Sequence, residues 1–189
     1  MLYKTHYESP LGDLLLTADA QALTGVWFDG QKYYARGQAD SEPEAGAAIC
    51  NAPCEEELAP LLAEAKRWLD IYFAGNEPDF DLPLNPTGTD FQKSVWSILC
   101  MIPYGKTMTY GQIAAQIAAE RGIARMSAQA VGGAVGHNPL SIIVPCHRVV
   151  GTNGSLTGYA GGIDRKIKLL TLEGINMSTF FVPKKGTAL

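Results

Sequence analysis

The stretch SIIVPCHRVV, residues 141–150, runs from an apolar segment through Pro145 into a cysteine, a histidine and an arginine, and then becomes apolar again. The apolar residues 142–144 predict a buried strand. Because successive side chains of a strand point to opposite faces, a regular strand would hold Cys146 and His147 apart. Proline lacks the amide proton that a strand uses, so it interrupts the regular backbone. We therefore expect an irregular turn, in which a water molecule links the thiol to the imidazole.

Cys146 is compatible with four roles. These are a buried structural residue, the nucleophile of a cysteine hydrolase, a metal ligand, and a thiolate that accepts a group from a substrate. A thiol with a pKa of about 8.5 is only a few per cent ionised at pH 7, so a reactive cysteine needs a base or a positive charge nearby. His147 is the candidate base, and Glu173, at the end of the last predicted helix, is the candidate that orients the imidazole.

The composition is that of an ordinary globular protein, since 47% of the 189 residues are hydrophobic and 18% are charged. This length is enough for one large domain or two small ones. No apolar run reaches about 18 residues, so we expect no membrane span. The first residues, MLYKTHYESP, lack the basic-then-apolar pattern of a signal peptide, so we expect a cytoplasmic protein.

The chain has four cysteines, Cys50, Cys54, Cys100 and Cys146. In a reducing compartment these are expected to be free thiols. The spacing of Cys50 and Cys54 is compatible with metal binding, but a second spaced pair of ligands is missing. We therefore predict a loop with two thiols and no metal site.

Charge is distributed unevenly along the chain. Residues 1–85 carry a net charge of −10, residues 86–174 carry +4, and the two lysines near the carboxyl end bring the total to −4. Such an asymmetry favours a polyanionic partner for the second half. Chance variation of surface charge between two domains explains it equally well.

The first third of the sequence predicts strands followed by a helix. Residues 12–19 and 22–30 are apolar stretches ended by Asp or Gly and predict a hairpin. Residues 32–36 predict another short strand, and residues 37–54 predict a loop. Apolar residues at spacings of three and four predict a helix over 55–74, with its leucine and aromatic stripe in the core.

The second half predicts helices around the Pro-Cys-His segment. Residues 76–90 are polar and proline-bearing and mark a domain boundary. Two Thr-x-x-Gln capping boxes, at Thr89 and Thr109, predict helix starts, and Cys100 on the first of these helices is expected in the core. Residues 124–138 then favour a helix-turn-helix arrangement with the preceding helix. A glycine-rich loop over 151–162 and a helix over 164–173 follow.

The segment PCHRVVG, preceded by AVGGAVGHNPLSIIV and followed by GSLTGYAGGIDRKIKLLTLEG, resembles the O6-alkylguanine-DNA alkyltransferase family, the methylated-DNA–protein-cysteine methyltransferases. The match is ordered and dense across residues 89–174, and it is far more specific than a lone Pro-Cys-His. The first 85 residues resemble the variable amino-terminal domain of this family only loosely, through strands followed by one helix.

The resemblance implies an α/β (α+β) protein of two domains. Residues 1–85 would form a ribonuclease-H-like structural domain, residues 86–174 a winged-helix-like domain that binds duplex DNA and carries the chemistry, and residues 175–189 a tail. The protein would act as a monomer and flip a damaged guanine out of the stack. It would move the alkyl group from O6 of guanine to its own cysteine, once per molecule and without a cofactor. Activity on O4 of thymine stays open.

Carried onto this sequence, the resemblance assigns the catalytic roles. Cys146 would be the nucleophile and acceptor, and His147 the base, working through a water. Glu173 would orient and charge-stabilise the imidazole. Asn138 would hydrogen-bond the turn around the cysteine, and Tyr110 would donate a proton or a hydrogen bond to N3 of the departing guanine.

The resemblance also implies which residues contact the flipped base and the DNA. Tyr159 would pack against the base, and the amide of Ala160 would face O6. The residues expected to bind the substrate base are Tyr159, Ala160, Val149 and Arg148. Those expected to bind DNA are Gln129, Arg125, Ser127, Ala128 and Gly132.

The sequence departs from the family pattern at Gln129, where the family usually has an arginine that fills the gap left by the flipped base. Arg125 lies one helical turn earlier and is expected to share the phosphate contacts. Two other classes of protein compete with an alkyltransferase: a DNA lesion sensor of the same fold without transfer, and a transcription regulator built on the helix-turn-helix. A cysteine at position 146 favours the alkyltransferase, since such sensors typically carry another residue there.

Overall fold

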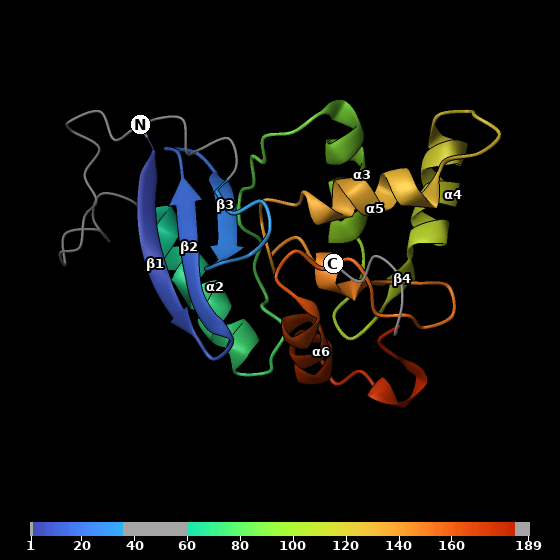
Figure 1. Cartoon of the computed structure of the whole chain (residues 1–189). Coiled ribbons are helices and arrows are strands. Elements are labelled where there is room, and N and C mark those ends of the chain that lie inside the picture. Colours follow the sequence, from blue (N-terminus) through green and yellow to red (C-terminus); the bar gives the residue numbers. More distant parts are fainter. Residues whose placement is uncertain (1, 36–59, 184–189) are drawn as a thin grey trace.

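The computed structural model describes residues 2–35 and 60–183. The chain begins with a three-stranded antiparallel sheet of β1 (Tyr3–Ser9), β2 (Gly12–Ala18) and β3 (Leu23–Phe28), in the order β1-β2-β3 (Figure 1). The register pairs Leu14 with Phe28, so the hairpin predicted for the second and third strands is confirmed. The first strand was not predicted, because its sequence, YKTHYES, is mostly polar and only Thr5 in it is buried.

The strand predicted over 32–36 is wrong for the part that the structure describes. Residues 32–35 form a turn, in which Tyr33 and Ala35 have φ values of 62° and 47°. Backbone in this left-handed region cannot continue a strand. The turn instead packs toward the second half of the chain, where the amide of Lys32 donates to the carbonyl of Ala160 at 3.0 Å.

Helix α2 (Pro60–Phe73) lies against the sheet (Figure 1). Its buried residues, Leu62, Ala65, Leu69 and Tyr72, recur at spacings of three and four, so the predicted core stripe is confirmed. The described residues do not include residues 55–59 of the predicted helix. They also do not include Cys50 and Cys54, for which a loop without a metal site was predicted. The helix brings Tyr72 toward the second half of the molecule.

Helices α3 (Asp90–Cys100) and α4 (Tyr110–Glu120) both begin with the predicted capping boxes. Thr89 accepts from the amide of Gln92, and Thr109 accepts from the amide of Gln112, while each glutamine side chain reaches back. The expectation that Cys100 is a core residue is wrong. It is exposed at the last residue of α3, where the helix face that it occupies points away from the core.

Helix α5 (Ala128–Gly136) crosses α3 and α4 (Figure 1). Its start is capped by Ser127, which accepts from the amide of Ala130. Directly before α4, the short strand β4 (Met108–Thr109) pairs in parallel with β5 (Val149–Val150). These contacts fix the start of α4 beside the Pro-Cys-His segment.

Residues 142–144 do not form the predicted strand. They belong to a turn in which Ile142 has a φ of 72°, and only Leu140 makes a bridge to Val26 of the sheet. Ile142 and Val144 are buried all the same, and Ile143 is half-buried. A continuous apolar run of this length indicates that a segment is buried, but it has no periodicity that distinguishes a strand from another conformation. The strand prediction is therefore wrong.

The chain then forms the 3-10 helix η1 (Cys146–Arg148), the glycine-rich loop, helix α6 (Ile163–Leu172) and the 3-10 helix η2 (Met177–Thr179). One hydrophobic cluster extends from the sheet and α2 to Val149 and Leu169. A small second cluster of Val150, Leu156 and Leu170 is covered by Phe180. Within the described ranges, no helix is long and apolar enough to cross a membrane.

Candidate active site

Cys146 begins the η1 turn, and Pro145 precedes it as the cap with φ −79° and ψ 62°. The amide of Cys146 donates to Val144 at 2.7 Å, and the amide of Arg148 donates to Pro145 at 3.0 Å. The backbone therefore turns tightly at the cysteine, and the alternation of a strand is absent. This confirms the irregular turn expected from the proline. The thiol is buried, with 4% of the residue exposed.

Asn138 holds this turn together, as the resemblance implied. Its Nδ2 donates to the carbonyl of Val144 at 2.8 Å, and it lies 3.1 Å from Sγ of Cys146. Its Oδ1 accepts from the amide of Leu140 at 3.0 Å. One buried amide thus fixes the turn and presents an N–H to the sulfur, where it stabilises a thiolate more than a thiol.

Burial raises the pKa of the Cys146 thiol above its ordinary value. The N–H of Asn138, the charge of Lys166 and the nearby backbone amides act in the opposite direction, but they do not overcome the desolvation. The resting sulfur therefore carries its proton. A nucleophilic reaction requires that a base remove this proton at the site.

His147 is fully buried, and its Nε2 lies 2.6 Å from Oε1 of Glu173. Burial lowers the pKa of His147, although the hydrogen bond and charge of Glu173 raise it in part. The imidazole is therefore neutral near pH 7, with the proton assigned to Nε2 by its carboxylate partner. Nδ1 then carries the lone pair, and this atom is buried without a hydrogen-bond partner. The geometry gives His147 a free acceptor.

Glu173, the cap residue of α6, is the centre of a buried polar cluster. Arg148 donates from Nε to Oε2 at 2.9 Å, and Gly105 donates its amide to Oε2 at 3.1 Å. Burial alone raises the pKa of the Glu173 carboxyl, but the hydrogen bonds and charges of His147 and Arg148 lower it to about 2. The carboxylate is ionised under all physiological conditions.

Arg148 and Val149 were predicted to bind the substrate base, and the structure gives their side chains other surroundings. The guanidinium of Arg148 is bound to Glu173 and donates from Nη1 to the carbonyl of Ile102 at 2.6 Å. Val149 is fully buried in the core. Both residues follow His147 in the sequence and were therefore expected beside the substrate base. The 3-10 turn instead directs the side chain of Arg148 to the carboxylate of Glu173.

Tyr110 is the first residue of α4, and its Oη donates to the carbonyl of Thr157 at 2.9 Å. Burial raises the pKa of Tyr110 to about 12, and the charge of Cys146 adds to this shift. The hydroxyl is a neutral donor close enough to the sulfur to respond to its charge. Gly158 makes room for it, because a Cβ there would lie 2.8 Å from Oη.

Tyr159 follows in the glycine-rich loop and is 3% exposed. Its ring lies 6.5 Å from that of His147, edge to face. Its Oη is buried without a partner, and burial raises its pKa well above the ordinary value. Among the described residues, the unsatisfied buried side-chain atoms are this hydroxyl and Nδ1 of His147. Both belong to residues around Cys146.

Two site residues were missed by the sequence analysis. Lys166 is fully buried and donates from Nζ to Val149 at 2.6 Å and to Thr157 at 2.7 Å. Burial lowers its pKa to about 8, and its charge lowers the pKa of Cys146. Its spacing with Leu169 and Leu170 on the buried face of α6 was the available signal. Tyr72 was assigned to the core, and its hydroxyl at a buried helix position was the signal.

The residues expected to contact DNA lie at the start of α5. Ser127, Ala128 and Gln129 are exposed, and Gly132 sits beside the ring of Tyr110. Arg125 is not one helical turn before Gln129, because α5 begins only at Ala128.

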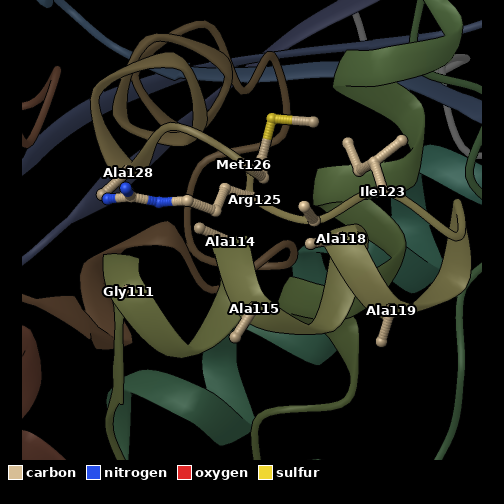
Figure 2. A pocket seen from close by; sticks show the side chains of 10 residues that line it. Gly111, Ala114, Ala115, Ala118, Ala119, Ile123, Arg125, Met126 and Ala128 are labelled. Atoms are coloured by element: carbon tan, nitrogen blue, oxygen red, sulfur yellow. The ribbon is translucent and has the colours of Figure 1, made fainter.

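Arg125 belongs to the connecting loop. There it lines a groove of about 460 Å³ between the loop and α4, with Met126 and Ile123 (Figure 2). The lining of this groove does not include Cys146, His147 or Glu173.

Known proteins share this sequence and this fold. Sequence models of two parts of one family, the 6-O-methylguanine DNA methyltransferase ribonuclease-like domain and DNA-binding domain, match residues 2–86 and 90–175. The methylated-DNA–protein-cysteine methyltransferase of Methanosarcina acetivorans is 44% identical over 92% of this chain and 99% of that protein. The corresponding protein of Haemophilus influenzae is 37% identical over 92% and 87%.

Solved structures agree with the sequence relatives. The crystal structure of Mycobacterium tuberculosis O6-methylguanine methyltransferase has 42% identity and a TM-score of 0.70, over 92% of this chain and 93% of that chain. The structure of Mycobacterium tuberculosis OGT in complex with DNA has 40% identity and a TM-score of 0.71, over 90% and 92%. The resemblance carried by the Pro-Cys-His segment is therefore confirmed, and the chain belongs to the 6-O-methylguanine DNA methyltransferase family.

Proposed function

We propose that this protein repairs DNA by direct reversal, moving an alkyl group from O6 of guanine to the sulfur of Cys146. The observation that carries the proposal is a buried thiol followed directly in the chain by a histidine whose Nδ1 is unpartnered and whose Nε2 contacts an ionised carboxylate. Relatives of this chain bear the name methylated-DNA–protein-cysteine methyltransferase, and a similar structure was solved in complex with DNA.

The transfer step moves one proton and one alkyl group. The proton of the Cys146 thiol passes through a water to Nδ1 of His147, while Nε2 keeps its hydrogen bond to Glu173. The thiolate attacks the alkyl carbon, an S–C bond forms, and the C–O6 bond breaks with its electron pair leaving on guanine. The carboxylate stabilises the imidazolium that forms. The thioether is stable, so each molecule acts once and needs no cofactor.

Negative charge develops on guanine as the C–O6 bond breaks. Tyr110 lies near the sulfur as a neutral hydroxyl donor, and in this proposal it donates to N3 of the leaving base. The amide of Ala160 faces O6, and Tyr159 packs against the base. To make this bond Tyr110 turns its proton away from the carbonyl of Thr157, and a donor placed where charge develops lowers the barrier.

The base reaches Cys146 only when it leaves the duplex, because the thiol is buried. We assign duplex contacts to the exposed start of α5, with Ser127, Ala128 and Gln129, and to Arg125 in the preceding loop. Helices α4 and α5 would then form a helix-turn-helix within a winged-helix-like unit. In this assignment residues 86–174 bind DNA and react, residues 1–85 support them, and residues 175–189 form a tail.

We also propose that the protein acts as a monomer in the cytoplasm. The polar cluster around Cys146 is formed by residues of one chain. A cysteine that must be a free thiol before it reacts requires a reducing compartment.

Mass spectrometry of the intact protein tests the proposal. After incubation with duplex DNA containing O6-methylguanine, one methyl group should appear on the peptide with Cys146, in a ratio of one per protein molecule. Cys146→Ala should gain no mass but should still bind DNA, while Cys100→Ala should react like the wild type. Binding without a mass change would identify a lesion sensor, and binding of undamaged operator-like DNA alone would identify a regulator.

A further inference from the structure

Tyr72 brings a hydroxyl from the first half of the chain into the cluster around His147. It lies in the last turn of α2 and is fully buried. Its Oη donates to Oε1 of Glu173 at 2.8 Å and lies 3.3 Å from Nε2 of His147. The ring is held in place by Trp68, with which it stacks at 5.6 Å, and by edge contacts with Tyr104 at 6.1 Å and His147 at 6.3 Å.

One carboxylate oxygen of Glu173 serves several donors. Oε1 accepts from Tyr72, faces Nε2 of His147 at 2.6 Å, and accepts from Nη2 of Arg148 at 3.1 Å. Donors that share one acceptor compete for its negative charge. The more strongly Tyr72 binds Oε1, the less that oxygen stabilises a proton on the imidazole. Packing alone requires only the ring, since a phenylalanine would fill the same stripe of α2.

We propose that Tyr72 is a positioning residue of the transfer site and sets the basicity of His147 through Oε1 of Glu173. The inference rests on the function proposed above, and it gives the first half of the chain a part in the chemistry beyond structural support. The hydroxyl does not touch the reacting atoms. It acts by fixing the carboxylate and by limiting the charge that this carboxylate offers to the imidazole.

Other charged or titratable groups also face Tyr72 and His147. Glu173 and Lys166 approach from α6 and its cap, Arg148 from η1, Cys146 from the same turn, Tyr159 from the glycine-rich loop, and Tyr104 from the segment before β4. A change of Tyr72 to phenylalanine leaves all of these in place. A shift in the titration of His147 is then assigned to the lost hydroxyl.

The direct test is an NMR titration of the imidazole nitrogens of the full-length protein, which has only three histidines. In Tyr72→Phe the pKa of His147 should rise by about half a pH unit or more, because the carboxylate loses a competing donor. The matched control is Tyr7→Phe. Tyr7 donates to Asp70 on the same helix at 2.8 Å, outside the cluster, and its loss should leave the pKa of His147 unchanged. Equal titrations of His147 in wild type and Tyr72→Phe overturn the proposal.

A second variant guards against misfolding and reverses the expected sign. Site-specific 3-fluorotyrosine at position 72 keeps the shape and gives a more acidic, stronger donor, so the pKa of His147 should fall. A rise or no change overturns the proposal. Single-turnover transfer should show the same ordering in the acidic limb of its pH profile. The titration needs no DNA, so an inactive wild type with the expected titrations would refute the proposed function and leave the role of Tyr72 standing.

Discussion

Nε2 of His147 lies 2.6 Å from Oε1 of Glu173, and neither side chain is exposed to solvent. On the far side of the same carboxylate, Arg148 donates at 2.9 Å. The arginine keeps the carboxylate charged, so the carboxylate can hold a neutral imidazole in one tautomer and stabilise its cation when a proton arrives. In the proposed mechanism, this arrangement of charges makes the buried and ordinarily protonated thiol of Cys146 reactive.

Glu173→Gln should slow transfer more than it weakens DNA binding. Glutamine removes the charge that stabilises the imidazolium, and it leaves Arg148 buried with no anionic partner. Breaking a buried ion pair from one side costs about 3–5 kcal/mol of stability. Single-turnover kinetics at saturating DNA and urea unfolding measure the two effects. An unchanged rate constant and pH profile would remove Glu173 from the mechanism.

Stability should fall steeply in acid, and the direction follows from two pKa values. The carboxyl of Glu173 has its pKa lowered from 4.5 to about 2, so the unfolded chain binds this proton first. Its contribution is present above pH 4.5 and is lost as the pH falls toward 2. A shift of this size corresponds to about 3 kcal/mol. The lowered pKa of His147 acts in the same direction below its ordinary value of 6.5.

Urea unfolding at a series of pH values tests this dependence. The wild type should lose stability through both windows, while Glu173→Gln should lack the lower one. The carboxyl of Glu173 should lose its contribution between pH 4.5 and about 2. If the stability of the wild type does not change from about pH 5 to about pH 3, the conclusion that the buried carboxylate is ionised is wrong.

Gly158→Ala should displace the hydroxyl of Tyr110. Gly158 has a φ of 67°, and an added Cβ would lie 2.8 Å from Oη of Tyr110. The strained backbone costs about 1–2 kcal/mol, and the shifted donor should slow transfer by about tenfold or more. Gly122→Ala is the matched control, since Gly122 has a φ of 62° with no atom near the added Cβ. Gly122→Ala should lose a similar amount of stability and keep its rate of transfer. If Gly158→Ala also keeps its rate of transfer, Tyr110 has no role in the reaction.

Gln129→Arg should raise affinity for duplex DNA several-fold, with a smaller gain on single strands. A guanidinium adds charge and donors that an amide lacks, and a well-placed charged hydrogen bond contributes about 1.5–3 kcal/mol. Comparison of Gln129→Ala with Arg125→Ala on duplex containing O6-methylguanine shows which residue fills the gap. If Arg125→Ala fails and Gln129→Ala reacts like the wild type, the intercalating role belongs to Arg125 in the loop.

Much of this protein is set by short-range sequence signals. The hairpin of β2 and β3 and the capping boxes of α3 and α4 were predictable because alternation, helical spacing and cap chemistry act within a few residues. Pro145 likewise predicted the turn at Cys146. His147 and Glu173 were candidates from the residues themselves, and the resemblance added Asn138. The structure places His147 against Glu173 and Asn138 against Cys146.

Contacts between distant segments decided the rest. Residues 142–144 form a turn, because the pairing of this segment with β3 ends at the bridge between Leu140 and Val26. Arg148 binds Glu173, 25 residues away, and Tyr72 binds the same carboxylate across 101 residues. No local pattern in a sequence encodes such pairs. A buried carboxylate must be satisfied by whichever donors the packing brings to it, and only the tertiary structure determines which donors those are.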